Sequence, residues 1–251
     1  MAKQDGILPL KGTIDKISFL KGKGAYLAKK KSEIDKSKIA SDPAFERTRE
    51  NNSEFGQACK AGQLLRGSLR ALTINASDRY MTGRLVQQLV KAIKADPVNQ
   101  RGKRNMVDGK PEMLQGFEFN GEGKLASVLK APFTTQIDRA TGALEVHIPA
   151  FIPMNMLPAP SGTTHFRINS AGIAIDFAGS SYVVDTVASA ILPWNRQNTA
   201  AINLSSSVGA ASTMPLILVL GVEFFQEVNG NPSPLKNGVF NALAIVQVDV
   251  V

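Results

Sequence analysis

The chain has 251 residues, 43% of them hydrophobic and 20% charged, with a net charge of +8 and a pI near 9.6. These proportions are ordinary for a folded soluble protein, and a chain of this length can bury a core. The single cysteine, Cys59, excludes an internal disulfide framework, and the longest apolar run, residues 215–222, is shorter than a membrane helix of about 20 residues. The N-terminus carries no apolar run of the kind a secretory signal needs, so we expect cytoplasmic synthesis. The sequence does not fix the final location of the protein, which includes release from the cell as part of a particle or filament.

Charge and aromatic residues are unevenly distributed along the chain. Residues 1–110 hold 23 Lys+Arg and 11 Asp+Glu, whereas residues 111–251 hold 6 and 10. Three phenylalanines precede residue 111 and nine follow it. The predicted fold class is therefore α+β, with a basic β-hairpin arm and linker (1–38), a basic, short helical bundle (39–110) and a C-terminal antiparallel β-sandwich (111–251).

The arm is predicted from residues 6–31. Residues 17–19 and 26–28 flank a glycine- and lysine-rich turn, which is the pattern of a β-hairpin. Because an isolated two-stranded hairpin is marginal in water, we expect it to pack against another surface. The segment from Lys29 to Lys38 predicts a solvated linker.

Two or three helices are predicted next. Asp42 and Pro43 supply a capping carboxylate and a proline suited to the first helical position. Residues spaced by three and four then predict one buried helix face: Phe55, Cys59, Gly62, Leu65, Leu69 and Leu72. The glycines of this helix predict that another element crosses it closely.

A second helix is predicted to open at Ser77. Its apolar side is formed by Met81, Leu85, Leu89 and Ile93. A short third helix is predicted to follow Asp96-Pro97 and to stop at residues 108–109.

From residue 112 onward, short strands and turns predict an antiparallel sandwich or barrel. Leu144, Val146 and Ile148 alternate with polar residues that include Glu145 and His147. Further strands are predicted on both sides of a break at residues 170–172, and at 181–186, 199–205, 216–228 and 239–251. Prolines between 149 and 160 predict a long loop.

The sequence contains no catalytic constellation. His147, His165 and one cysteine offer no zinc-type ligand spacing, and Cys59 fits a small buried hydrophobic residue. Glu223 and Glu227 share one side of a predicted strand, where solvation is their usual role. We therefore predict no enzymatic activity, no metal site and no cofactor.

Two features of the β region point to assembly instead. The β-branched strand that ends in residues 243–251 would be an aggregation template if its edge stayed exposed. Residues 215–225 are apolar on both faces, as expected of a strand that is covered twice. With the hairpin as an arm that can add to a neighbouring sheet, we predict a structural, self-assembling subunit of a filament, tube, shell or phage-like particle. Its partners would be copies of itself.

The expected contact residues form two groups. The arm interface comprises Ile14, Ile17, Phe19, Tyr26 and Leu27, and the charge contacts comprise Lys29, Lys30, Lys31, Arg47 and Arg49. The basic front would meet the weakly acidic β surface of a neighbour, which favours orientation and encounter more than affinity.

Two other functions fit parts of the pattern. A nucleic-acid-binding accessory protein would use a basic cluster made of Lys91, Lys94, Arg101, Lys103 and Arg104. Residues 82–116 contain no aromatic residue, so nucleic acid is not the favoured partner. A surface- or carbohydrate-binding sandwich would use Trp194 and Tyr182 as a stacking platform, although a lone tryptophan after a proline more often belongs to a core.

The stretches KGTI (11–14), ASDPAFERTREN (40–51), SEFG (53–56), AILPW (190–194) and QEVNG (226–230) are distinctive together. They resemble an uncharacterised family of bacterial proteins of similar length, with matches spread over most of the chain. The resemblance implies that the basic front and the β back form one unit. It implies no activity and no site residues.

Overall fold

The computed structural model of the chain describes residues 2–4, 10–22, 24–30, 36–235 and 240–250. By their internal contacts the residues divide into two compact units, 1–50 and 51–251. Within the described ranges, no helix is both long enough and apolar enough to cross a membrane.

The N-terminal unit contains an antiparallel sheet, here called sheet A, with the strand order β1-β4-β3-β2. Its elements are β1 (Ala2–Lys3), β2 (Gly12–Ile14), β3 (Ile17–Lys21), β4 (Tyr26–Lys30), α1 (Lys36–Ser41) and the 3₁₀ helix η1 (Pro43–Phe45). The predicted hairpin is confirmed as β3 and β4, and the Gly22 amide closes its turn on the Ala25 carbonyl at 2.8 Å.

The predicted linker is wrong at both ends. Lys29 and Lys30 belong to β4, and residues 36–38 belong to α1, while residues 31–35 lie outside the described part of the chain. The predicted helix start is confirmed. The Asp42 carboxylate accepts a hydrogen bond from the Ala44 amide at 2.9 Å, Pro43 opens η1, and α2 (Glu46–Ser68) follows directly.

Three helices form one layer of the second unit: α2, α3 (Arg70–Thr73) and α4 (Met81–Lys94). The predicted apolar side of α4 is confirmed. The predicted close crossing is confirmed at Gly62, where an added Cβ would lie 3.2 Å from Leu89 Cδ1 of α4.

The predicted buried face of α2 is wrong in its first half. Phe55 is 55% exposed and Cys59 is only half-buried, whereas Glu54 and Ala58 are buried. In this half the buried positions come one residue earlier than predicted, and the buried Glu54 carboxylate accepts a hydrogen bond from the Gly102 amide at 2.9 Å.

The predicted third helix is also wrong, because residues 95–110 form an irregular loop. The buried Asp96 carboxylate accepts hydrogen bonds from the amides of Val98, Asn99 and Asn105 and from the Asn99 side chain, at 2.8 to 3.2 Å. These bonds replace the helical pattern, since an Asp side chain competes with the helix for nearby backbone donors.

The β region contains two antiparallel sheets. Sheet B comprises β7 (His165–Asp176), β8 (Ser181–Ala188), β9 (Leu192–Pro193), β11 (Leu216–Val228), β12 (Asn231–Pro234) and β13 (Ala242–Asp249). Sheet C comprises β5 (Thr134–Asp138), β6 (Ala143–Ile148) and β10 (Ile202–Ser207). Short helical turns lie in the connections: η2 (Pro111–Leu114), α5 (Leu125–Val128) and α6 (Pro153–Met156). The predicted strand at 216–228 and the alternation of β6 are confirmed.

The predicted break at residues 170–172 is wrong, because β7 runs through it. Ser170 donates its hydroxyl to the Val219 carbonyl at 3.0 Å, and Gly172 makes room for sheet C, since an added Cβ would lie 2.5 Å from Ser206 Oγ. Glycine within a strand commonly marks such a close approach.

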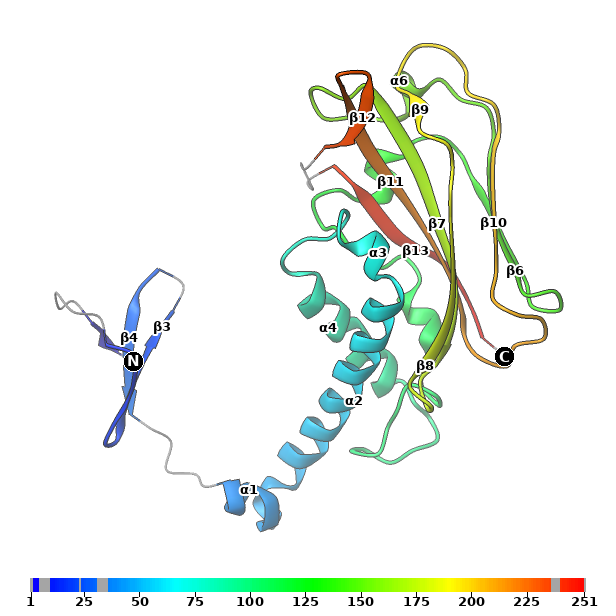
Figure 1. Cartoon of the computed structure of the whole chain (residues 1–251). Helices are drawn as coiled ribbons and strands as arrows, with labels where there is room; N and C mark the ends of the chain where they lie inside the picture. Colours follow the sequence, from blue (N-terminus) through cyan, green and yellow to red (C-terminus); the bar gives the residue numbers. More distant parts are fainter. Residues whose placement is uncertain (1, 5–9, 23, 31–35, 236–239, 251) are drawn as a thin grey trace. The chain divides into compact units, whose positions relative to one another are not determined.

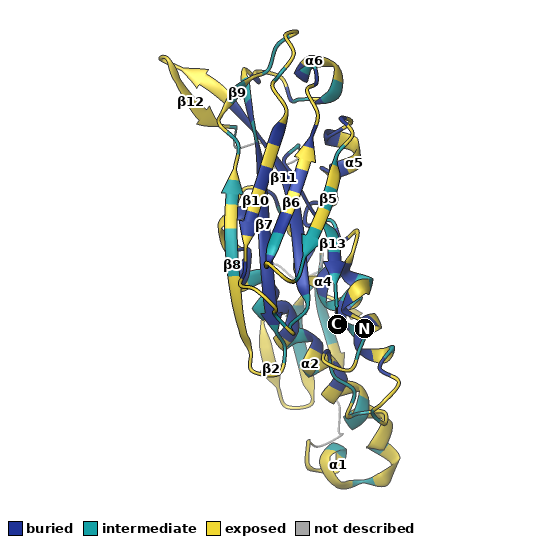
Figure 2. Cartoon of the chain, turned by 90° about the vertical axis from the view of Figure 1, so that its right-hand side faces the viewer, coloured by how far each residue is buried: buried dark blue, intermediate teal, exposed yellow. Residues whose placement is uncertain are grey.

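Sheet B is the middle of three layers, with α2 and α4 on one face and sheet C on the other (Figure 1). Alternate residues of its central strands enter two cores. Ile173 and Val219 contact the helices, whereas Ile168 and Leu218 contact sheet C. Figure 2 shows β7 and β11 buried along most of their length. The predicted α+β architecture with a C-terminal sandwich is confirmed, and the double cover of β11 comes from its own chain.

The C-terminal strand β13 is covered on both edges for half its length. One edge pairs with β11. Along the other, residues 116–119 exchange three backbone hydrogen bonds with Leu243 and Ile245 at 2.8 to 3.0 Å. Over residues 242–245 this strand therefore has no exposed edge, because a segment more than 120 residues earlier in the chain protects it.

Candidate functional site

The strand register of sheet A places the predicted arm residues. Cross-strand partners lie on the same face of a sheet. Ile14 pairs with Ile17, Phe19 with Ala28, and Tyr26 with Lys21. One face therefore carries Ile14, Ile17, Phe19 and Tyr26, and we call these four residues the arm face. Leu27 pairs with Leu20 on the opposite face, so the fifth predicted residue is separated from the other four.

The arm face is not covered by its own unit. Ile14 is 61% exposed and Ile17 is 48% exposed, while Phe19 and Tyr26 are half-buried. None of the described residues before residue 51 is buried. A small sheet normally packs its apolar face against another element, since burial of that face provides most of its stability.

The rim of the arm face is basic. Lys21 Nζ lies 5.8 Å from the centre of the Tyr26 ring, and Lys30 is the cross-strand partner of Ile17. The turn between the two isoleucines consists of Asp15 and Lys16, with Asp15 in a left-handed conformation at φ 49°. The arm face is therefore apolar at its centre and carries two lysines along its strands.

The predicted charge contacts lie on separate elements. Lys29 is exposed on β4, Arg47 is exposed on α2, and Lys31 lies outside the described residues. Arg49 Nη1 donates to the carbonyls of Ile39 and Asp42, both at 2.8 Å, and so connects α1 to the start of α2. Arg49 has a local structural role in the fold.

The basic cluster of the nucleic-acid alternative lies at the end of α4 and in the loop that follows. Lys91, Lys94 and Lys103 are exposed, and Arg104 is half-buried. Arg101 Nη2 donates to Asn51 Oδ1 of α2 at 3.0 Å. This bond and the contact between Gly102 and Glu54 anchor the loop to α2.

The two aromatic residues of the carbohydrate alternative lie far apart. Pro193, which precedes Trp194, pairs with the first residue of β7, and Tyr182 pairs with Ile175 near its end. Ten residues of strand separate these positions by about 30 Å. Trp194 packs at the edge of the core shared with sheet C and donates its indole N–H to the Leu157 carbonyl at 2.9 Å. These two residues therefore do not form a shared stacking platform.

The polar residues weighed for catalysis are engaged in local contacts. His147 lies on the exposed face of β6, 2.5 Å from Asn203 Oδ1. Glu223 is not a solvated surface residue as predicted. It is buried because Arg167 Nη2 contacts its Oε2 at 2.6 Å and Asn75 Nδ2 donates to its Oε1 at 3.1 Å. In the described part of the chain, no three His, Cys, Asp or Glu side chains are grouped as metal ligands.

Sequence reasoning missed a groove beside the turn between β7 and β8. Two adjoining cavities of about 390 and 510 Å³ share Val107, Phe177 and Ala178 in their walls. The residues of the groove come from α2, the loop 105–109, the start of η2, the end of β7 with the turn to β8, the loop before β11 and the residue after β13. No local sequence signal marks it, since it forms only where these segments meet.

No protein-family model matches the chain, and no curated protein matches it. A solved structure reported under "pH-induced modulation of Streptococcus parasanguinis adhesion by Fap1 fimbriae" aligns with 45% of this chain and 78% of its own, at 12% identity and a TM-score of 0.22. A likeness at that TM-score carries no argument about this chain.

Proposed function

We propose that the protein is a structural, self-assembling subunit whose arm face is covered by a second copy of the same chain. The observation that carries this proposal is the exposure of Ile14 and Ile17 on a sheet with no buried residue among those described. An exposed apolar face on a small sheet favours association, since its burial removes apolar surface from water.

The distribution of charge supports a copy of the chain as the partner. The arm face carries Lys21 and Lys30, while residues 111–251 hold 10 acidic and 6 basic residues. Opposite charges on two surfaces of one chain steer copies together. A contact between two different surfaces is heterologous, so the assembly is a ring if the rotation closes and a filament if it does not.

Residues 242–245 of β13 do not offer a free strand edge to this assembly. Their outer edge is paired within the chain, and both faces of β11 are covered by the helices and by sheet C. The arm face is therefore the donor surface of the proposed contact.

The test is the size of the full chain and of two double variants, measured by light scattering after gel filtration. Ile14→Glu with Ile17→Glu changes the arm face, and Thr13→Glu with Ser18→Glu adds the same charge to the opposite face of the same strands. We expect multimers from the unchanged chain and the control, and a species near 26.9 kDa from the arm-face variant.

Negative-stain imaging of the multimer then separates filament, ring and shell. A full chain that runs as a monomer, or an arm-face variant that keeps the size of the multimer, would contradict the proposed function.

A further inference from the structure

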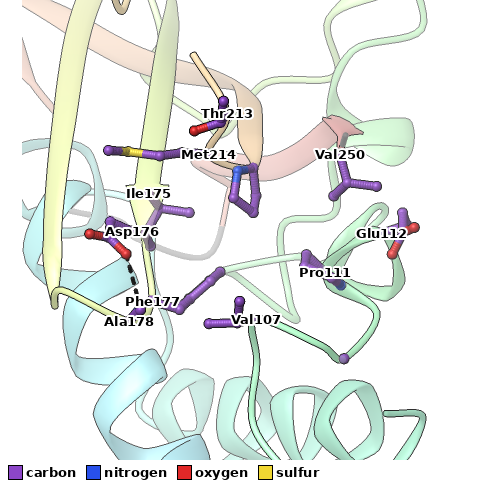
Figure 3. A pocket seen from close by; sticks show the side chains of 12 residues that line it. Val107, Pro111, Glu112, Ile175, Asp176, Phe177, Ala178, Thr213, Met214 and Val250 are labelled. Carbon is purple, nitrogen blue, oxygen red and sulfur yellow. Dashed lines mark hydrogen bonds between the residues drawn. The ribbon is translucent and has the colours of Figure 1, made fainter. Parts of the chain in front are cut away.

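The groove beside the β7–β8 turn has an apolar wall open to solvent. Figure 3 shows Phe177 next to Val107, with Pro111 and Val250 toward the other side of the cavity. Val107 is 58% exposed. The cavity of about 390 Å³ is many times the ~30 Å³ occupied by one water molecule, so it has room for apolar side chains.

The charged groups of this cavity are both acidic. Glu112 and Asp176 are the charged residues in its wall, and Glu112 is exposed on η2. The Asp176 carboxylate accepts hydrogen bonds from the Ala178 and Gly179 amides, both at 2.9 Å, which holds it at the turn (Figure 3). The adjoining cavity adds Asp108 and Lys60. The groove thus has one apolar wall and three carboxylates against one lysine, whereas the arm face carries apolar residues and two lysines.

We propose that this groove is the acceptor site for the arm face of a second copy. The inference rests on the proposed function and names the surface that the arm contacts. Ile14 and Ile17 flank a two-residue turn, so they lie side by side at the narrow end of the β2–β3 hairpin. The pair of isoleucines beside this charged turn is narrow enough for a groove of this size, and Lys21 and Lys30 are the cations of the arm face that complement Glu112 and Asp176.

The proposed contact combines apolar complementarity with charge complementarity. Burial of the isoleucines against Val107 and Phe177 supplies the affinity, because it removes apolar surface from water. The charges select the orientation. Since the donor and acceptor surfaces differ, one copy gives its arm to one neighbour and receives the arm of another, which propagates the assembly.

The first experiment is disulfide trapping between two differently tagged full-length copies expressed together. Both carry Cys59→Ser; one carries Ile17→Cys and the other Val107→Cys. After mild oxidation we expect a band with both tags on a non-reducing gel. Two control pairs replace Ile17→Cys by Ser18→Cys, on the other face of β3, or Val107→Cys by Val98→Cys, which is 73% exposed outside the groove.

Equal trapping in the control pairs, or no trapping in the test pair, would overturn the acceptor site. The second measurement is the size of a full-length Val107→Glu variant beside Val98→Glu. We expect Val107→Glu to lose the multimer and Val98→Glu to keep it.

These outcomes separate the two proposals. If Ile14→Glu with Ile17→Glu dissociates the multimer while Val107→Glu leaves it intact, the groove is not the acceptor and self-assembly through the arm stands. If the unchanged chain is a monomer, both proposals fail.

Discussion

Two buried carboxylates, Glu54 and Asp96, organise the loop between α4 and η2. Glu54 is 1% exposed and accepts the Gly102 amide, and Asp96 is 4% exposed and accepts four hydrogen bonds. The same loop supplies Val107 to the groove. The position of Val107 in the proposed docking groove therefore depends on hydrogen bonds to two carboxylates that lie elsewhere in the sequence.

Asp96 connects the stability of this loop to pH. Burial alone would raise the pKa of Asp96, but the hydrogen bonds from Asn99, Val98 and Asn105 outweigh it and lower the pKa from 3.8 to about 2. A carboxyl whose pKa is lowered by folding stabilises the native state at pH values above its unfolded pKa. That stabilisation is lost as the pH falls from about 4 to about 2.

We predict that Asp96→Asn lowers the free energy of unfolding by about 2 kcal/mol at neutral pH, since hydrogen bonds to a charged acceptor contribute about 1.5–3 kcal/mol each. The difference from the unchanged chain should shrink between about pH 4 and pH 2, as Asp96 itself becomes protonated. Urea unfolding at one protein concentration measures both quantities. Glu122→Gln is the control, because Glu122 is exposed and lies outside the hydrogen bonds around Asp96, and a constant difference at all pH values would contradict the prediction.

At the scale of elements, α2 and α4 cross closely within one layer. The helices approach at Gly62, where a Cβ would lie 3.2 Å from Leu89 and 3.5 Å from Val86. At Gly56, six residues earlier in the same helix, a Cβ would meet no atom within 4 Å. A substitution at Gly56 therefore tests helix propensity alone, whereas a substitution at Gly62 also tests the packing of the two helices.

We predict opposite effects on stability at these two positions. Gly62→Leu should lower the free energy of unfolding by about 1–3 kcal/mol, because it overpacks the crossing. Gly56→Ala should raise it by up to about 1 kcal/mol, because alanine favours the helix and nothing obstructs its methyl group. Thermal unfolding followed by circular dichroism gives both shifts, and stabilisation by Gly62→Leu would show that the crossing is looser than described.

At the scale of the whole molecule, the two cores draw their buried residues from Ala58 onward. The N-terminal unit contributes no buried residue from its described part. The stability of residues 51–251 and the proposed association through the arm can therefore be measured separately.

We predict that a chain lacking residues 1–35 unfolds cooperatively with a Tm that is independent of protein concentration. The full chain should show a Tm that rises with concentration, because association stabilises the native state by mass action. Differential scanning calorimetry over a hundredfold range of concentration tests this. A truncated chain that fails to fold would show that the arm contributes to the core of the body.

The sequence by itself determined the elements whose pattern is local. The bounds of β11, the apolar side of α4 and the cap formed by Asp42 and Pro43 follow from periodicity and from bonds between near neighbours. Four residues of the arm face were predictable for the same reason, since hairpin register follows from the turn. Leu27 was misplaced because its side chain alternates to the other face.

Only the tertiary structure decided which surfaces are covered. Residues 116–119 cover the outer edge of β13, and Asn75 reaches Glu223 across 148 positions of sequence. The buried Glu54 finds its hydrogen-bond donor in Gly102, 48 positions later, and the groove depends on segments spread from α2 to the residue after β13. Such contacts join residues that carry no signal of each other along the chain, because burial is a property of the packed layers and not of local periodicity.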